Sequence, residues 1–263
     1  MQTKTEMISK NQIKYIRQLE LKKFRKRENC FVAEGPKVVG DLMRKYQPIA
    51  IYATEEYFKE SGVSGQVSGI RNQEIVVTAE ELRRISFLQT PQQVLALFPI
   101  PPSENFQFSI FNSQLSLALD GIQDPGNLGT IIRIADWFGI DTIYCSEDTA
   151  DVYNPKVVQA TMGSLAHVHI IYTNLLKLFD SLPNDYPIYG TLLDGDDIYQ
   201  QPLSQEGIIV MGNEGNGISE AVRQRVTHRL LIPNFHQGDS AESLNVAIAT
   251  AITCSEFRRR GTK

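Results

Sequence analysis

The stretch IIVMGNEGNGISE, residues Ile208–Glu220, determines how the second half of the chain is expected to fold. Its four leading apolar residues, Ile208 to Met211, precede a turn and predict a short buried strand. Three glycines follow within six residues: Gly212, Gly215 and Gly217. Glycine tolerates positive φ and lets another group approach the bare backbone. Ser219 can then cap a helix. A strand, a glycine loop and a helix in this order are typical of ligand sites in open α/β sheets.

Composition narrows the class of protein. The chain has 263 residues, enough for one large or two modest domains, and 42% hydrophobic residues, an ordinary share for a globular protein. No apolar run reaches the length of a membrane span, and the polar, basic first residues predict no secretory signal. The three scattered cysteines, Cys30, Cys145 and Cys254, favour reduced thiols in the cytoplasm over disulfides or a zinc site. We therefore expect a cytoplasmic protein without a metal or a membrane segment.

Charge is unevenly distributed along the chain. The net charge is −4, yet residues 1–30 hold six Lys and three Arg against three Glu, a net of +6, which leaves −10 for the rest. A basic end of this kind favours a polyanion such as RNA as partner, although a solvated helix face gives the same pattern. A helix is expected from Ser9, with apolar positions Ile13, Ile16, Leu19 and Phe24. The candidate RNA-binding residues on its polar surface are Asn11, Lys14, Arg17, Lys22 and Arg25.

Helices and strands alternate through residues 1–98, which predicts a small α/β domain. Strands are expected at 30–35, 49–53, 75–77 and 94–98, and helices at 36–44, 54–60 and 78–85, the last opened by the capping box of Thr78 and Glu81. The proline-rich segment 99–113 is expected to be a linker. Residues 114–263 then form the second domain.

The second domain repeats the strand–helix unit, which predicts a mostly parallel sheet with helices on both faces. We expect strands at 115–119, 142–145, 168–172, 187–192, 208–211 and 230–232. Helices are expected after Asn127, which can cap the first, and from Asn154, Asn174, Ser219 and Ser243; residues 194–206 are expected to be a polar loop. On the first helix, the apolar positions Ile131, Ile134, Ala135 and Phe138 are expected to face the core.

Polar residues follow three of these strands, after Leu119, Met211 and Ile232. If the strands are parallel neighbours, their loops meet at one edge of the sheet. The set gathered there is Asn127, Arg133, Asn213, Glu214, Ser243 and Asn245. It contains no nucleophile beside a base and no metal cluster, so it suits a reaction whose co-substrate brings its own leaving group.

The motifs at this edge resemble those of a known family. DPGNLGTIIRIAD (124–136), IIVMGNEGNGIS (208–219) and LLIPNFHQGDSAESLNVAIATAI (230–252) are similar to the three motifs of the SpoU family of RNA ribose 2′-O-methyltransferases, within the SPOUT superfamily. Residues 1–98 resemble the L30e-like substrate-binding domain of its ribosomal-RNA members, on ISKNQIKYIRQL, FVAEG and LQTPQQVLALF.

The resemblance implies S-adenosylmethionine as cofactor, a C-terminal trefoil knot and a homodimer formed through the catalytic domain. By motif position, the cofactor-binding residues would be Met211, Gly212, Asn213, Gly215, Ile232, Pro233 and Leu244. The catalytic residues would be Asn127, Arg133, Glu214, Ser243 and Asn245. A guanidinium stays protonated in proteins, so we expect Arg133 to hold the target phosphate and polarise the hydroxyl, with a role as base as the alternative. The loop Pro233–Asp239 is about three residues longer than is common in the family, and the family assigns no role to its His236.

Three other functions remain open from the sequence. A transfer-RNA methyltransferase of the same family would carry the same catalytic motifs. An RNA-binding or ribosome-assembly protein without catalysis would need only the basic helix. An α/β enzyme that binds a nucleotide phosphate at the glycine loop would leave residues 1–98 without a purpose, and no lysine follows the glycines.

Overall fold

The computed structural model describes residues 8–62, 73–102, 114–236, 239 and 241–260. Its contacts divide the chain into two compact units, Met1–Pro102 with Asp151–Ala166, and Ser103–Ala150 with His167–Lys263. The prediction of an α/β protein with a mostly parallel second sheet is confirmed. The expected linker falls largely on 103–113, outside the described residues, so the domain boundaries drawn from the sequence stay predictions.

The first unit is built on a mixed four-stranded sheet in the order β1-β4-β2-β3. Its strands are β1 (Cys30–Glu34), β2 (Ala50–Ala53), β3 (Gln73–Val76) and β4 (Val94–Pro99). Strand β4 runs antiparallel to both β1 and β2, whereas β2 and β3 are parallel. All four agree with the expected strands to within two residues. Three of them, β1, β2 and β4, are short and mostly apolar runs.

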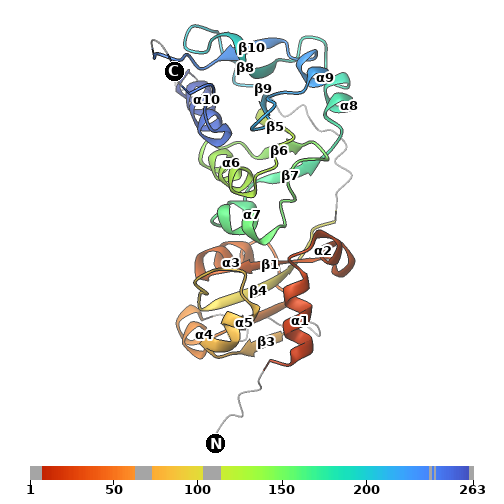
Figure 1. Cartoon of the computed structure of the whole chain (residues 1–263), viewed down its shortest axis with the longest axis vertical. Helices are drawn as coiled ribbons and strands as arrows, with labels where there is room; N and C mark the ends of the chain where they lie inside the picture. Colours follow the sequence, from red (N-terminus) through yellow and green to blue (C-terminus); the bar gives the residue numbers. More distant parts are fainter. Residues whose placement is uncertain (1–7, 63–72, 103–113, 237–238, 240, 261–263) are drawn as a thin grey trace, which may run out of the picture. The chain divides into compact units, whose positions relative to one another are not determined.

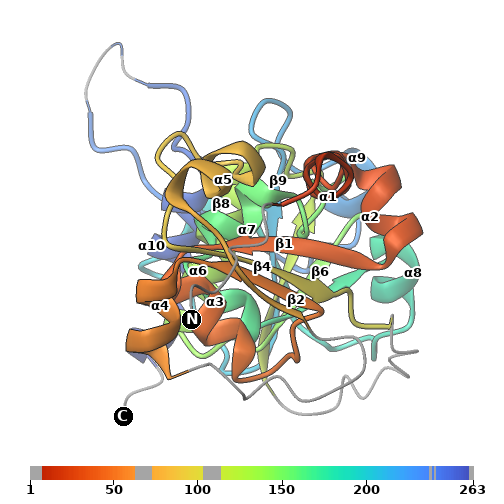
Figure 2. The same ribbon diagram turned by 90° about the horizontal axis from the view of Figure 1, so that it is seen from below.

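Helices cover both faces of this sheet (Figure 2). They are α1 (Lys10–Gln18), α2 (Lys22–Glu28), α3 (Pro36–Met43), α4 (Glu55–Ser61) and α5 (Ala79–Ile85). The expected capping box of Thr78 and Glu81 is present, and a second one joins Ser9 and Gln12. The expected single basic helix is instead two helices, since the chain turns after α1 and Leu19 is packed in the core.

The segment Asp151–Ala166 lies in the second half of the sequence but packs in the first unit. It contains α7 (Pro155–Ala160), capped by Asn154, and the 3-10 turn Ser164–Ala166. The Tyr153 ring packs on Phe31 of β1 with ring centroids 4.9 Å apart, and Val157 is fully buried. The core of the first unit is therefore completed by residues from a distant part of the chain.

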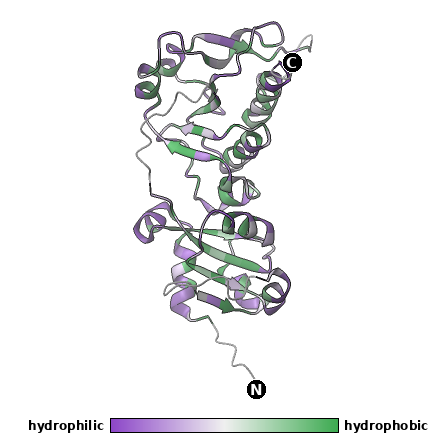
Figure 3. Ribbon diagram, turned by 180° about the vertical axis from the view of Figure 1, so that it is seen from behind, coloured by the Kyte–Doolittle hydropathy of each residue, from purple (hydrophilic) through white to green (hydrophobic). Residues whose placement is uncertain are grey.

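The second unit is built on a six-stranded, entirely parallel sheet in the order β10-β8-β9-β5-β6-β7. The strands are β5 (Leu115–Asp120), β6 (Thr142–Cys145), β7 (His169–Tyr172), β8 (Ile188–Asp197), β9 (Gly207–Gly212) and β10 (His228–Leu231). The two central strands, β5 and β9, are almost wholly buried. Figure 3 shows green, hydrophobic stretches of strand in this unit beside purple ones. Continuous apolar runs are expected where helices cover both faces of a parallel sheet.

Helices α6 (Pro125–Trp137) and α10 (Val246–Arg260) pack against each other (Figure 1). The opposite side of the sheet has its own core cluster, which contains residues of α8 (Leu175–Asp180) and α9 (Glu220–Arg223). On α6, Ile132 is buried and Ile134 only partly so, which shifts the core face from the expected one. None of the helices in the described residues is long and apolar enough to cross a membrane.

Strand β8 departs from the expected arrangement. A polar loop was expected from Asp194, but β8 continues to Asp197 after an excursion at residues 191–195. The register against β10 shows this, because Gly190 pairs with Arg229 and the next pair is Asp196 with Leu230. Asp194 within the excursion is held by the guanidinium groups of Arg223 and Arg229. These contacts come from distant residues, so the local sequence pattern could not predict the extension.

Candidate functional site

The carboxyl ends of β5 and β9 lie side by side and position the site. The two strands are parallel and in register, with Asp120 opposite Gly212. Their following loops therefore start at the same edge of the sheet, as expected for two of the three motifs. Strand β10, which precedes the third motif, is separated from β9 by β8, so its loop reaches the others by a longer path.

Glu214 is the centre of a hydrogen-bond network at this edge. Its carboxylate accepts from the backbone N–H of Gln123 at 3.3 Å and of Asp124 at 3.2 Å. It also accepts from the side-chain amides of Asn127 at 3.0 Å and Asn213 at 3.4 Å. The first and second motifs are therefore joined directly through one carboxylate.

These donors also set the protonation state of Glu214. Burial alone would raise the pKa of its carboxyl group, but the hydrogen bonds from Asn127 and from the backbone of Gln123 and Asp124 hold the pKa below its ordinary value. Glu214 is thus ionised at neutral pH and its oxygens are occupied. This arrangement suits a group that holds the two loops together rather than one that accepts a proton from a substrate.

The glycine loop is folded tightly back on itself. The backbones of Asn213 and Gly217 exchange two hydrogen bonds of 2.9 Å, and the Asn213 side-chain oxygen accepts from the N–H of Gly215 and of Asn216. A Cβ atom on Gly212 would lie 2.2 Å from the Gly217 carbonyl carbon, so only glycine fits there. A Cβ on Gly215 would meet only the Asn213 oxygen, at 3.6 Å, and Gly215 is exposed. The loop therefore presents bare backbone outward at Gly215.

Asn245 brings the third motif to the first. Its side-chain nitrogen donates to the Asn127 oxygen at 2.9 Å, while its own oxygen accepts from the N–H of Ala247 at 3.0 Å at the start of α10. A continuous chain of hydrogen bonds thus runs from Asn245 through Asn127 to Glu214. Residues that are 118 and 87 positions apart in sequence are linked by this chain.

The remaining third-motif residues are less closely tied to the network. Ile232 and Pro233 directly follow β10 and are half-buried. Ser243 and Leu244 are exposed and precede α10, whose first residue is Val246; a helix from Ser243 was expected. The helix starts later because the Asn245 side chain takes the capping position. Positions 237, 238 and 240 of the long loop lie outside the described residues.

Arg133 lies on α6 with its side chain in solvent. It is exposed, and within the described parts of the chain it forms no hydrogen bond or ion pair with another residue. The exposed Trp137 lies one turn further along the same helix, so the two side chains share a face. No hydrogen bond among the described residues joins Arg133 to the Glu214 network, and its exposure leaves the guanidinium available to a ligand.

Several residues of the site were not predicted. The Asp124 side chain, and not Asn127, caps α6, accepting from the Asn127 N–H at 2.8 Å. The sequence signal for this was present, because Pro125 prefers the first helical position and so points to the residue before it as the cap. Asp120 accepts from the Ser219 N–H at 2.7 Å, and Thr191 donates to the Val210 carbonyl at 3.2 Å. The latter contact places the start of the β8 excursion beside β9.

The expected RNA-binding residues of the first unit fall into two groups. Asn11, Lys14 and Lys22 are exposed; Arg17 is also exposed, but its guanidinium donates to the Ser86 carbonyl and stacks on the Phe87 ring at 4.8 Å. The expectation that Arg25 lies on the surface is wrong. Its side chain is 2% exposed and forms an ion pair with Asp151 at 2.6 Å, so it is unavailable to RNA phosphates.

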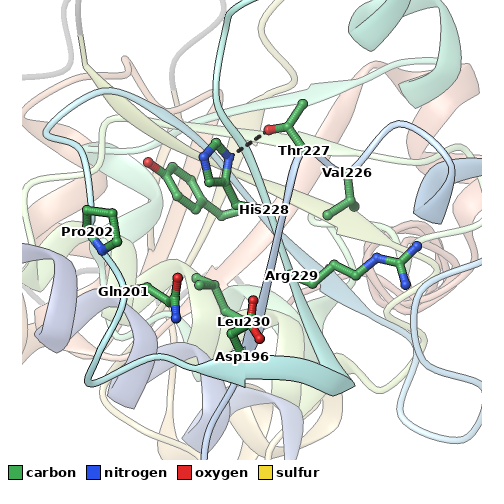
Figure 4. A pocket seen from close by; sticks show the side chains of 9 residues that line it. Asp196, Gln201, Pro202, Val226, Thr227, His228, Arg229 and Leu230 are labelled. Atoms are coloured by element: carbon green, nitrogen blue, oxygen red, sulfur yellow. Dashed lines mark hydrogen bonds between the residues drawn. The ribbon is translucent and has the colours of Figure 1, made fainter.

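In the described residues there is no metal site, and the cavity between β8 and β10 does not coincide with the candidate site. In the described residues, no three His, Cys, Asp or Glu side chains gather as a metal site, and Cys30, Cys145 and Cys254 are buried free thiols. A cavity of about 280 Å³ lies between β8 and β10, where His228 contacts Thr227 at 2.8 Å (Figure 4). None of the residues predicted to bind cofactor or to act in catalysis lines it, so it is not assigned to the reaction.

Comparison with family models divides the chain in the same way as its motifs. Residues 114–255 match the SpoU rRNA Methylase family, and residues 10–96 match the MRM3-like substrate binding domain. Over 254 residues, the chain is 31% identical to the 23S rRNA (guanosine(2553)-2′-O)-methyltransferase RlmP of Bacillus subtilis, covering 95% of this chain and 97% of that protein.

Solved structures show the same fold over nearly the whole chain. A protein assigned to the TrmH family of RNA methyltransferases, from Porphyromonas gingivalis, is 42% identical with a TM-score of 0.85, covering 97% of this chain and 99% of the other. An rRNA methyltransferase from Sinorhizobium meliloti, solved with S-adenosylmethionine bound, is 28% identical with a TM-score of 0.78, covering 95% of each chain. The similarity thus extends over both units.

Proposed function

The chain belongs to the SpoU rRNA methylase family, and from this premise we propose that it transfers the methyl group of S-adenosylmethionine to a ribose 2′-hydroxyl of ribosomal RNA. The observation that carries the proposal is the chain of hydrogen bonds from Asn245 through Asn127 to Glu214. It joins the loops of all three motifs, so three of the five residues that the family resemblance assigns to catalysis, Asn127, Glu214 and Asn245, form one connected group. A cytoplasmic location is part of the proposal, since the cysteines are free thiols.

The glycine loop supports the cofactor assignment. The exposed Gly215 leaves backbone accessible beside Asn213, as a ligand held by main-chain groups requires. We propose that the cofactor contacts Met211, Gly212, Asn213 and Gly215, together with Ile232, Pro233 and Leu244. Thr191, at the start of the β8 excursion, extends this set because it contacts Val210 of β9. When bound, the cofactor supplies an electrophilic methyl group on a sulfonium.

Arg133 is the residue to which we assign the substrate. Its exposed guanidinium has no partner in the described part of the chain, and α6 starts at the loop that holds Glu214. A planar fork of donors recognises a phosphate and can polarise an adjacent hydroxyl. As the 2′-oxygen forms its bond to the methyl carbon, the carbon–sulfur bond breaks and the hydroxyl proton leaves to solvent. Asn127, Glu214 and Asn245 hold the loops in place, and the exposed Ser243 is assigned to the substrate side.

The function is tested by methyl transfer to defined RNA. Purified protein and labelled S-adenosylmethionine are incubated in separate reactions with 16S rRNA, with 23S rRNA and with bulk tRNA. We expect label in ribosomal RNA at a ribose 2′-oxygen. Methylation there makes the adjacent phosphodiester bond resistant to alkaline cleavage. Label confined to tRNA would assign the other branch of the family. No label, with RNA binding retained, would favour a binding protein without catalysis.

The exposed side of α1 and the start of α2 are the surface that we assign to RNA. Asn11, Lys14 and Arg17 lie three residues apart along one helix edge, and Lys22 follows at the start of α2. Arg25 is removed from this set because it is buried. Lys14 is exposed, so its loss should affect RNA affinity without affecting the core.

Lys14→Ala is expected to weaken RNA binding and to reduce its dependence on salt. Each phosphate contact releases counterions, so the slope of log K against log salt should become shallower by about 0.7–0.9. The measurement is fluorescence anisotropy at several salt concentrations. Lys59→Ala is the matched control, since Lys59 is an exposed lysine of α4 that is paired with Glu55. Equal slopes for Lys14→Ala and the unchanged protein would contradict the assignment.

A homodimer through the second unit, with a C-terminal trefoil knot, completes the proposal by family resemblance. Exposed apolar side chains on the two packed helices support the dimer. Trp137 of α6 is 85% exposed, and Ile248 of α10 is 53% exposed. A large aromatic side chain that is exposed in the single chain is expected at a surface that a partner covers in the dimer.

Trp137→Glu is expected to shift the protein from dimer to monomer, because a buried unpaired charge is strongly unfavourable in an interface. Sedimentation velocity at micromolar concentration measures the change. Leu21→Glu is the control, since Leu21 is an exposed apolar residue of the first unit. A monomeric unchanged protein, or a Trp137→Glu protein that stays dimeric, would rule out this interface.

A further inference from the structure

The buried Arg25 connects two parts of the chain that the family models place in different domains. Its Nη1 donates to the carbonyls of Leu19 at 2.7 Å and Glu20 at 2.6 Å, which form the turn between α1 and α2. Its Nη2 donates to Asp151 at 2.6 Å. Arg25 lies within the match to the substrate-binding domain, and Asp151 lies within the match to the methylase. One guanidinium therefore holds both the turn between the RNA-binding helices and a residue of the catalytic half.

Asp151 is well placed to pass this restraint along the chain. It accepts from the Tyr153 N–H through its other carboxylate oxygen at 3.1 Å, and its carbonyl accepts from the Asn154 N–H at 2.9 Å. The residue before it, Ala150, donates its N–H to the carbonyl of Ile122 at 2.8 Å. Ile122 belongs to the loop whose next two N–H groups bind the Glu214 carboxylate. Only one peptide bond separates Asp151 from this contact with the catalytic loop.

Stability of the fold alone does not explain why the Arg25–Asp151 ion pair is buried. Taking both charges out of water costs free energy that the attraction between them barely repays, and apolar residues of the same size often do as well. The Arg25 Nε is also buried without a hydrogen-bond partner in the described residues, which adds to that cost. A pair that contributes little net stability is more readily explained by the geometry it fixes.

We propose that Arg25 is a positioning residue of the methyl-transfer reaction, which acts through Asp151 on the loop Gly121–Asp124. The inference rests on the proposed function for its kinetic test, but its structural claim stands apart from activity. RNA bound to α1 and α2 would order the same turn that Arg25 holds. The restraint on Asp151 would then keep the Ile122 contact, and with it the two backbone donors to Glu214, in the geometry that catalysis requires.

The first measurement is hydrogen exchange, which does not depend on activity. Arg25→Met should speed exchange of the amides in residues 121–124 and 146–150, as well as in 151–166. Asp151→Asn provides a second variant of the same shape, which can still accept from the Tyr153 N–H. Arg225→Met is the matched control, because it breaks the exposed pair of Arg225 with Asp180 elsewhere in the second unit. Faster exchange confined to 151–166 would overturn the proposal.

The second measurement separates turnover from binding, well below the melting temperature of each variant. Arg25→Met should lower kcat by roughly tenfold to a hundredfold, as misplacement of a reacting group does, with the affinities for RNA and cofactor unchanged. Arg25→Lys, which keeps the charge but not the fork, should fall in between. An unchanged kcat with only a lower Tm would make the pair structural. A parallel loss of RNA affinity would mean that Arg25 acts through the turn between α1 and α2 and not through Asp151, which would also overturn the proposal.

Two further outcomes are distinguishable. If Arg25→Met, Arg25→Lys and Asp151→Asn are all unfolded, the pair is a requirement of the fold and the positioning role is wrong. If the unchanged protein transfers no methyl group to any RNA, the proposed function fails instead. In that case the exchange of residues 121–124 still decides whether Arg25 restrains the loop.

Discussion

Arg133→Ala is expected to remove most methyl transfer, by about a hundredfold or more, while the protein keeps its melting temperature. Loss of one preorganised charged donor at a reacting oxygen costs on this order. Stability should be unaffected because Arg133 is exposed and forms no hydrogen bond or ion pair with the described residues. Affinity for S-adenosylmethionine should also be retained, since the proposed cofactor residues lie on other elements. Single-turnover kinetics and calorimetry measure the two quantities.

Two companion variants test the chemistry of Arg133. Arg133→Lys should recover little activity, because an ammonium is a point charge and cannot bind a phosphate through two parallel hydrogen bonds. Arg225→Ala is the control, since it removes an arginine that already has a partner in Asp180. If Arg133→Ala lowers cofactor affinity in parallel with turnover, or unfolds the protein, Arg133 belongs to the cofactor site or the scaffold.

Gly212→Ala is expected to damage both the fold of the glycine loop and cofactor binding. The added Cβ would lie 2.2 Å from backbone atoms of Gly217 and Ile218, so the loop must move. Overpacking of this kind costs about 1–3 kcal/mol. If this cost applies only to the cofactor-bound conformation, the affinity for the cofactor decreases by roughly fivefold to 150-fold. Differential scanning calorimetry and titration with S-adenosylmethionine give the two effects.

Gly215→Val separates the ligand from the loop. A Cβ at Gly215 meets only the Asn213 oxygen, at 3.6 Å, so the loop itself has room for a side chain. We expect an unchanged melting temperature with loss of cofactor affinity, because the side chain would occupy the space of the ligand. Gly40→Ala, in α3, is the neutral control, since a Cβ there meets nothing within 4 Å. Full cofactor affinity in Gly215→Val would place the ligand elsewhere.

Local sequence patterns predicted most of the secondary structure and the edge of the sheet where the loops meet. The capping box at Thr78 and the apolar runs of β5 and β9 depend only on neighbouring residues, so the local sequence predicts them. The cap of α6 was assigned to Asn127 instead of Asp124, although Pro125 gave the local signal for the correct residue. That error reflects a missed rule and not missing information.

Other features could not be read because distant residues determine them. Arg25 looks like its neighbours Lys22 and Lys26 in a basic stretch, and the charge that pairs with it when it is buried comes from Asp151, 126 positions away. The excursion in β8 likewise depends on Arg223 and Arg229, which hold Asp194. The roles of the site residues in binding and catalysis stay predictions, and the link from Asn245 to Asn127 is where their test should start.

The discontinuous first unit affects how the protein can fold while it is being synthesised. The strand that carries Phe31 leaves the ribosome long before Tyr153, and Arg25 long before Asp151, which follows 126 residues later. At about 5–20 residues per second, this delay lasts roughly 6–25 s. Throughout that interval an apolar strand face and an unpaired cation remain uncovered on the nascent chain. We therefore expect the amino-terminal unit to be bound by chaperones until residue 166 has emerged.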